Sequence, residues 1–283
     1  MITTQQIQQY REVGAVVVPG LLDEPTRQLM KSVLADWVEG SREVTAHTDL
    51  YDLEPGHTSD DPRVRRIKKP HLAHPVFYEF ARSKALTVCL RALLGNSARL
   101  YGSKLNLKAS GFGSPVEWHQ DWAFYPHTND DIITALLFLD DVDETNGALT
   151  IVPGSHKGPM YSLFDGERFT GAVSDADEKA LLAQSIPCYG PAGSVCLMHT
   201  KLAHGSAPNA GTKPRGLYIC VYTAADAVPL ARNPMPSTHE GEVIRGKPAR
   251  FARITETRVE LPQQPKSASF FTVQGQASAQ AAE

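Results

Sequence analysis

Apolar residues in the first third of the chain recur at the spacing of amphipathic helices. This spacing predicts helices over 3–14, 23–40 and 75–94. The apolar run 15–18 lies between the first two helices and predicts a short strand. Residues 41–74 are rich in charged residues, and their Asp and Pro content predicts a long loop.

From residue 96 onward the pattern changes to short apolar runs separated by turn residues. A helix over 175–183 interrupts this series. Eight short strands are typical of a jelly roll, so we expect a mainly β fold with flanking helices. The predicted strands are 98–102, 105–109, 117–121, 132–139, 148–152, 185–189, 194–198 and 215–223.

We expect a single folded domain over 1–262, because sheet-rich folds commonly reach roughly 200–250 residues as one unit. This domain divides into a helical part (1–95), a β-rich core (96–225) and a C-terminal extension (226–262). Residues 263–283 are rich in Gln, Ala and Ser without periodicity, and they predict a flexible tail.

Composition and charge exclude several classes of protein. Hydrophobic residues make up 42% and charged residues 21% of the 283 positions, which excludes a disordered or coiled-coil chain. A net charge of -3 provides no basic surface for nucleic acid or an anionic membrane, so we expect neither as a partner. The N-terminus lacks a signal-peptide pattern and the four cysteines are too sparse for a disulfide framework. We therefore expect a cytoplasmic protein, whose oligomeric state the sequence does not indicate.

A metal-binding pattern lies in the strand-rich part of the chain. His119 and Asp121 are two residues apart in the predicted strand 117–121, and alternate residues of a strand point to the same face. The pair can therefore occupy adjacent coordination positions of one metal ion. A second His-x-Asp, at 47–49, falls outside any predicted strand, where loop and capping roles are the simpler interpretation.

A distant histidine would complete the metal site, and both His199 and His204 follow the apolar strand 194–198. Arg215 favours His204, because it lies eleven residues beyond it at the start of a strand. An arginine there can form a bidentate pair with a carboxylate beside the metal. Two histidines and one aspartate leave the other positions of an octahedral site open, which suits a 2-oxo acid and O2 at Fe(II).

Three segments of the chain resemble a known protein family. They are WHQDWAFYP (118–126), TNGALTIVPGSHKG (145–158), and HGSAPN (204–209) followed by Arg215, and they resemble the phytanoyl-CoA dioxygenase (PhyH-like) family. The N-terminal segment 5–30 is similar to that family as well. The resemblance implies an Fe(II)- and 2-oxoglutarate-dependent oxygenase with a double-stranded β-helix core, which is a cupin-like jelly roll.

The resemblance also implies roles for individual residues. His119, Asp121 and His204 match the iron ligands of the family. Arg215 matches the arginine that pairs with the distal carboxylate of 2-oxoglutarate, and Ser206 matches a hydroxyl that assists it. Fe(II), 2-oxoglutarate and O2 are therefore the cofactor and cosubstrates that the resemblance implies.

Three further positions bear on the expected cosubstrate site. Lys108 falls where many members of the family have a lysine that contacts the cosubstrate. Leu136 departs from the family pattern, because some members have a Trp there against the cosubstrate. We expect that wall to be built differently, with Thr134 as a candidate hydroxyl donor to the same carboxylate.

The carboxylate ligand bears on the type of reaction. Relatives that halogenate replace it with a small residue to make room for chloride, so Asp121 implies hydroxylation or a related oxidation, with release of succinate and CO2. Desaturation and ring formation remain open. The expected substrate is a small or medium-sized organic molecule, such as a natural-product intermediate or an acyl thioester, and the sequence does not identify it.

Two other classes of protein fit part of the pattern. A cupin-like metal-binding protein would keep the three ligands without oxygenase activity, and a zinc-dependent enzyme would keep them with another metal. Arg215 argues against a simple metal-binding protein, because such a site needs no partner for a carboxylate. Consumption of 2-oxoglutarate in the presence of Fe(II) would separate these classes.

A basic run lies within the expected loop. It consists of Arg63, Arg65, Arg66, Lys68 and Lys69. One interpretation is a solvated surface whose charges pair with nearby acidic residues. The other is a lid over the mouth of the core that orients an anionic group of the substrate.

Overall fold

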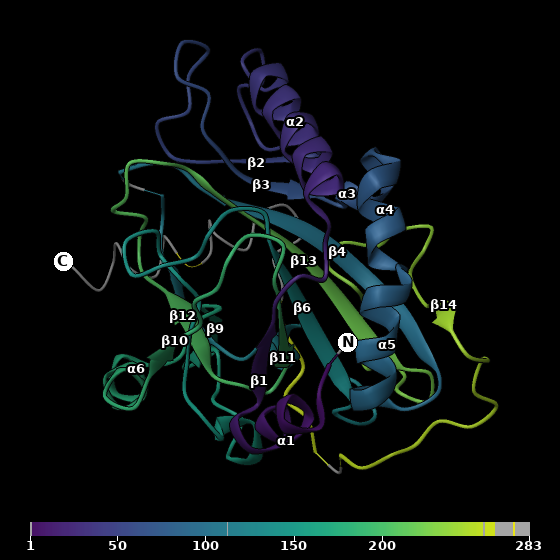
Figure 1. The fold of residues 1–283 in the computed structure, drawn as a ribbon. Coiled ribbons are helices and arrows are strands. Elements are labelled where there is room, and N and C mark those ends of the chain that lie inside the picture. Colours follow the sequence, from purple (N-terminus) through teal and green to yellow (C-terminus); the bar gives the residue numbers. More distant parts are fainter. Residues whose placement is uncertain (1, 112, 257, 264–273, 275–283) are drawn as a thin grey trace.

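Two antiparallel sheets form the core of the computed structural model, which describes residues 2–111, 113–256, 258–263 and 274 (Figure 1). The larger sheet has the strand order β1-β11-β6-β13-β4-β3-β2, and β14 also pairs with β4. Its strands are β1 (Ala15–Val18), β2 (Tyr51–Leu53), β3 (Val64–Lys68), β4 (Ala98–Lys108), β6 (Ile132–Phe138), β11 (Val195–His199), β13 (Arg215–Ala224) and β14 (Glu242–Arg245).

The smaller sheet has the strand order β10-β7-β12-β5. Its strands are β5 (Val116–His119), β7 (Thr150–Ile151), β10 (Ile186–Pro187) and β12 (His204–Ser206). A separate hairpin is formed by β8 (Phe164–Asp165) and β9 (Arg168–Phe169).

The two sheets pack against each other through apolar side chains. Leu136 of β6 and Leu217 of β13 share one buried cluster with Ile151 of β7 in the smaller sheet. Burial of this shared surface is the main favourable contribution to holding the two sheets together. The mainly β, jelly-roll fold with flanking helices that the sequence predicts is confirmed.

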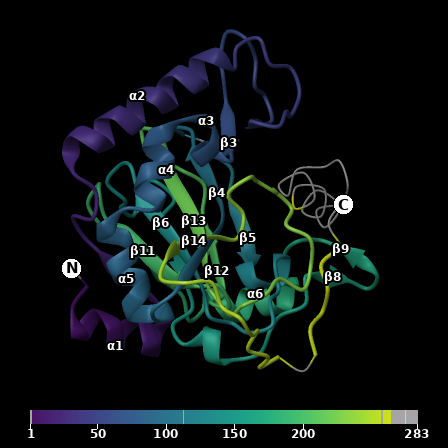
Figure 2. The ribbon, with the colours of Figure 1, turned by 90° about the vertical axis from the view of Figure 1, so that its right-hand side faces the viewer.

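Helices cover the opposite face of the larger sheet (Figures 1 and 2). Tyr218 and Tyr222 of β13 donate hydrogen bonds to the carbonyl oxygens of Phe77 (3.0 Å) and Ala81 (2.7 Å) on α4. Because both of its faces are covered, every residue of β13 is buried. The helices are α1 (Thr4–Val13), α2 (Glu24–Gly40), α3 (Pro70–Ala73), α4 (Pro75–Ala81), α5 (Lys84–Leu94) and α6 (Asp175–Leu182), with 3-10 turns η1 (Asp121–Phe124) and η2 (Ser155–Lys157).

The predicted helix boundaries follow from capping residues. Thr3 and Gln6 form a capping box at the start of α1, and Asp23 accepts a hydrogen bond from the backbone of Thr26 at the start of α2. The helix predicted over 75–94 is two helices in the structure. The first ends at Ala81, and Ser83 caps the second, because its side chain accepts a hydrogen bond from the backbone N–H of Leu86.

The prediction of a long loop over 41–74 is wrong. This segment contains β2, β3 and α3, and β3 joins the edge of the larger sheet by pairing with β4. Only two apolar side chains of β3, Val64 and Ile67, are fully buried among its cations, so the strand pattern in the sequence is weak. The predicted strands 98–102 and 105–109 are one continuous strand, β4.

The predicted tail 263–283 lies outside the described residues except for residues 263 and 274. Gln274 donates a side-chain hydrogen bond to the carbonyl oxygen of Gly171 (2.7 Å). None of the helices formed by the described residues has the length and apolar character needed to span a membrane.

Candidate metal centre and cosubstrate pocket

Two strands of the smaller sheet bring His119 and His204 together. His119 ends β5 and His204 begins β12, and the two residues are direct partners in the antiparallel ladder. Their ring centroids lie 4.2 Å apart, in contact distance. Asp121 follows β5 as the first residue of η1, so the prediction that His119 and Asp121 share one strand is wrong. The turn nevertheless brings Asp121 Oδ1 to 3.6 Å from His119 Nε2.

These three side chains form a compact set of metal-ligand atoms. One potential ligand atom from each of His119, Asp121 and His204 lies within 4.8 Å of the others, and all three residues are buried. Such a separation suits adjacent coordination positions around one ion. Among the described residues, no other cluster of three such side chains meets this spacing.

Both histidines are oriented by backbone carbonyl groups. His119 Nδ1 lies 2.7 Å from the carbonyl oxygen of Glu117, and His204 Nδ1 lies 2.8 Å from that of Leu202. Because a carbonyl oxygen only accepts, Nδ1 carries the proton in each ring. The lone pair therefore lies on Nε2, the atom available to a metal ion.

Asp121 is oriented by a side chain of the larger sheet. The Thr134 hydroxyl of β6 donates a 2.7 Å hydrogen bond to Asp121 Oδ2. We expected this hydroxyl to serve the carboxylate of 2-oxoglutarate, but in the structure it serves Asp121. The difference arises because η1 turns the Asp121 side chain towards β6.

The protonation states of the cluster suit metal binding. Burial lowers the pKa of His204 to about 4, and the neighbouring His119 adds to this effect, so the imidazole of His204 is neutral near pH 7. Burial opposes ionisation of Asp121, yet the positive charge of Lys104 holds its pKa well below the usual range. Imidazole nitrogens from two histidines and one carboxylate oxygen are the ligand set typical of non-haem Fe(II) oxygenases.

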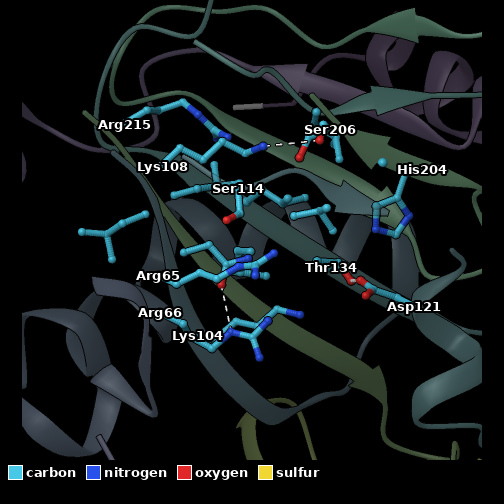
Figure 3. A pocket seen from close by; sticks show the side chains of 18 of the residues that line it. Arg65, Arg66, Lys104, Lys108, Ser114, Asp121, Thr134, His204, Ser206 and Arg215 are labelled. Carbon is cyan, nitrogen blue, oxygen red and sulfur yellow. Dashed lines mark hydrogen bonds between the residues drawn. The ribbon is translucent and has the colours of Figure 1, made fainter. Parts of the chain in front are cut away.

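A positively charged group lies at one side of the same pocket (Figure 3). Arg215 and Lys108 are direct partners in the ladder between β13 and β4. Arg215 Nε donates to the carbonyl oxygen of Asn146 (3.0 Å), and Nη2 donates to that of Gly147 (2.8 Å). Burial lowers the pKa of Arg215 to about 10, so the guanidinium remains charged near pH 7.

Gly147 is required where the pocket wall is closely packed. Its φ of 71° lies in the left-handed region. A Cβ at this position would lie 2.6 Å from the carbonyl oxygen of Ala207 and 2.9 Å from Lys108 Cδ. The glycine therefore lets its carbonyl reach Arg215 while the neighbouring chains stay in contact.

Lys108 and Ser206 lie beside Arg215 in the pocket wall. Lys108 Nζ donates to the carbonyl oxygens of Ser206 (3.4 Å) and Ala207. Burial, together with the charges of Arg215 and Arg65, lowers the pKa of Lys108 to about 7. Cations that lower one another's pKa in this way would gain from an anion placed between them.

The pocket that joins these groups has a volume of about 670 Å³, including the open space at its mouth. This size falls in the range of small-molecule sites. Leu136 lies in its wall, where we expected a departure from the family pattern. Four more apolar side chains complete that wall: Leu149, Met198, Leu217 and Ile219.

Two sequence candidates lie elsewhere. His47 is in an exposed loop, where its Nδ1 accepts from the backbone of Leu53 (3.1 Å) and Thr48 caps the turn. His199 lies 4.0 Å from Asp130 and does not line the pocket. The loop interpretation of 47–49 and the preference for His204 over His199 therefore agree with the structure.

The sequence reasoning missed three polar residues of the pocket wall, namely Lys104, Asn106 and Ser114, and it placed Arg65 and Arg66, which also line the pocket, in a loop. Lys104, Asn106 and Lys108 are alternate residues of β4, so they project from the same face. The sequence analysis did not reveal this alternation, because it predicted two separate strands, 98–102 and 105–109, with Lys104 between them.

Comparisons with known proteins agree with this geometry. Residues 10–217 match the family described as phytanoyl-CoA dioxygenase (PhyH). The chain is 37% identical over 227 residues to a probable alpha-ketoglutarate-dependent hypophosphite dioxygenase of Stutzerimonas stutzeri, covering 79% of each protein. It is 27% identical to the L-proline trans-4-hydroxylase of Streptomyces griseoviridis, covering 78% of this chain and 86% of that protein. The crystal structure of EctD from S. alaskensis with bound Fe shares the fold, with a TM-score of 0.69 at 20% identity and 88% coverage of each chain.

Proposed function

The chain belongs to the phytanoyl-CoA dioxygenase family, and on that basis we propose that His119, Asp121 and His204 hold its catalytic iron. The protein is an Fe(II)- and 2-oxoglutarate-dependent dioxygenase, an oxidoreductase that acts on a small molecule. The observation that carries the ligand assignment is the buried cluster of three ligand atoms, all oriented by hydrogen bonds. When bound, iron and 2-oxoglutarate would allow O2 to oxidise the substrate, with release of succinate and CO2.

The chain's own residues prepare this site before iron arrives. The carbonyl oxygens of Glu117 and Leu202 hold the protons of the two histidines on Nδ1, away from the metal position. Thr134 holds the carboxylate of Asp121. Because these contacts fix the side chains, little conformational freedom is lost on metal binding.

Arg215, Ser206 and Lys108 form the proposed site for the distal carboxylate of 2-oxoglutarate. The planar guanidinium of Arg215 can donate two parallel hydrogen bonds to that group, and Lys108 adds a second positive charge. The carbonyl oxygens of Asn146 and Gly147 hold Arg215 in position. Leu136 and its apolar neighbours line the same pocket as this group and the metal ligands.

The proposed reaction is hydroxylation, or another oxidation, of a small substrate. Two relatives are named for activity on compounds of few atoms, hypophosphite and L-proline. Asp121 keeps a carboxylate in the ligand set, which supports oxidation rather than transfer of a halide. A zinc-dependent or purely metal-binding role has no need for the buried Arg215.

Single alanine variants of the three ligands test this assignment. We expect His119→Ala, Asp121→Ala and His204→Ala to lose Fe(II) binding and 2-oxoglutarate-dependent succinate formation. His47→Ala is the matched control, because it removes a His-x-Asp histidine from an exposed loop. Loss of both properties in the control, with retention in His119→Ala, would place the metal elsewhere.

A further inference from the structure

A second group of cations lies in the pocket, apart from Arg215 and Lys108. It consists of Arg65 and Arg66 of β3 and Lys104 of β4, which Figure 3 shows together on one side of the cavity. We call these three residues the β3–β4 cation group. None of the functions assigned so far uses them.

Position along β4 separates this group from the proposed 2-oxoglutarate site. Lys104 and Lys108 are four residues apart on the same face of the strand, so their Cα atoms are about 13 Å apart. Lys108 is beside Arg215, whereas Lys104 pairs across the ladder with Lys68 of β3 and faces the pocket. A 2-oxoglutarate molecule that reaches from the metal position to Arg215 would therefore leave the region around Lys104 unfilled.

The β3–β4 cation group lies close to the proposed metal. The charge of Lys104 helps to keep the pKa of Asp121 low, and Arg66 also interacts electrostatically with Asp121. An anion held by Lys104 would therefore lie near the position where oxidation takes place. The substrate bonds next to that anionic group would then lie within reach of the reaction.

The guanidinium of Arg66 is held in a fixed position. Its Nε donates a 3.0 Å hydrogen bond to Asn106 Oδ1, and its Nη1 lies 3.8 Å from Oδ2 of Asp52, its ladder partner on β2. Arg65 is anchored by a 2.8 Å hydrogen bond from Nη2 to the carbonyl oxygen of Pro115. Such bracing keeps cations oriented towards a ligand at a small cost in side-chain entropy.

Lys104 is the least constrained member of the group. Its ammonium makes no hydrogen bond or ion pair with the described residues, although its side chain is partly buried. Burial lowers the pKa of Lys104 to about 8, the charge of Asp121 opposes this shift, and the charge of Arg66 adds to it. A partly buried ammonium that makes no hydrogen bond is costly, and a bound anion would reduce that cost.

The charge balance of the pocket also favours a second anion. Among the described residues that line it, five are cationic and one, Asp121, is a carboxylate. Fe(II) would add two positive charges and 2-oxoglutarate two negative charges, so these cancel. Asp52, Glu54 and Glu117 do not line the pocket, but their negative charges compensate part of the excess at the neighbouring cations.

We propose that the β3–β4 cation group binds an oxyanion of the substrate, a carboxylate or a phosphonate, beside the metal position. This inference rests on the proposed function, because it assumes that 2-oxoglutarate occupies the Arg215 side of the pocket. It names the substrate class as small organic acids. The lid interpretation of the basic run is replaced, because β3 is a strand of the sheet and only Arg65 and Arg66 of the run line the pocket.

Binding of two small acids to the anaerobic protein loaded with Fe(II) and 2-oxoglutarate tests the proposal. The probes are methylphosphonate and acetate, with dimethyl sulfone as a neutral probe of similar size, and calorimetry measures each affinity. We expect one or both acids to bind and the sulfone not to bind. Lys104→Met should weaken acid binding by about tenfold or more, and Lys104→Arg should retain most of it.

The matched control is Lys69→Met, which removes the same charge from a residue of the basic run outside the pocket wall. It should leave acid affinity unchanged at low and high salt. Fe(II) and 2-oxoglutarate affinities are measured in every variant, and acid binding is compared at saturating concentrations of both. Equal acid binding by the parent and Lys104→Met would overturn the proposal, as would a loss confined to 2-oxoglutarate affinity.

The two proposals fail in different ways. If the parent binds neither Fe(II) nor 2-oxoglutarate, the proposed function is wrong and the inference about the substrate falls with it. If both bind but no acid binds, the proposed function stands and the substrate inference is wrong. If an acid does bind, the comparison of methylphosphonate with acetate distinguishes a phosphonate site from a carboxylate site.

Discussion

Replacement of Thr134 by valine removes one hydroxyl and keeps the shape of the side chain. Thr134 is buried on β6, and its hydroxyl donates a 2.7 Å hydrogen bond to Asp121 Oδ2. Hydrogen bonds to charged groups contribute about 1.5–3 kcal/mol, which corresponds to roughly a tenfold to 150-fold change in an equilibrium constant. Loss of a partner that orients a metal ligand commonly weakens metal affinity by about 10- to 100-fold. We therefore expect Thr134→Val to weaken Fe(II) binding by about 10- to 100-fold.

Anaerobic titration with Fe(II) measures this effect, and Thr134→Ser should restore most of the affinity because it restores the hydroxyl. Thr223→Val is the matched control, since Thr223 is a buried threonine of β13 that is not among the pocket residues. At saturating Fe(II), the affinity of Thr134→Val for 2-oxoglutarate should match that of the parent. Unchanged iron affinity with weaker 2-oxoglutarate binding would refute this reasoning and would restore a direct role towards the cosubstrate.

Three further outcomes follow from the pocket. Arg215→Ala should raise the 2-oxoglutarate concentration for half-maximal succinate formation by about tenfold to over a hundredfold, and Arg215→Lys should recover little of the lost affinity. If Arg215→Ala weakened the binding of Fe(II) alone as much as that of 2-oxoglutarate, the variant would instead have a folding defect. Asp121→Gly should abolish substrate oxidation even where iron stays bound, and full activity in a product assay would contradict the ligand assignment. Burial and the charges of Arg215 and Arg65 lower the pKa of Lys108 to about 7, and Glu54 and Glu117 oppose this shift. Lys108 loses its positive charge as the pH rises above that value, so the affinity for 2-oxoglutarate should fall. Titrations across pH 6 to 9 should show a smaller fall in Lys108→Met.

Much of the fold was predictable because its signals are local. The caps Thr3 and Asp23 set the starts of α1 and α2, and the apolar run of β6 predicts a strand buried on both faces. The strand β3 was missed because its cations alternate poorly with its apolar residues. Its position depends on pairing with β4, a contact across about forty residues that local pattern does not encode.

The candidate site was predictable to the extent that spacing encodes it. Arg215, eleven residues after His204, selected that histidine over His199, and the structure places His204 beside His119. The role of Thr134 was not predictable, because it depends on the turn η1 that directs Asp121 towards β6. Lys104 was missed because a strand break was assumed near Gly102, whereas β4 continues to Lys108.

The position of bound iron tests the central claim most directly. Crystals grown anaerobically with Fe(II) and 2-oxoglutarate would show it through anomalous scattering at the iron absorption edge. We expect a single strong peak bonded to Nε2 of His119, Nε2 of His204 and a carboxylate oxygen of Asp121, with 2-oxoglutarate extending to Arg215. Iron bound at another place, or 2-oxoglutarate held by Lys104 with Arg215 unused, would contradict the account.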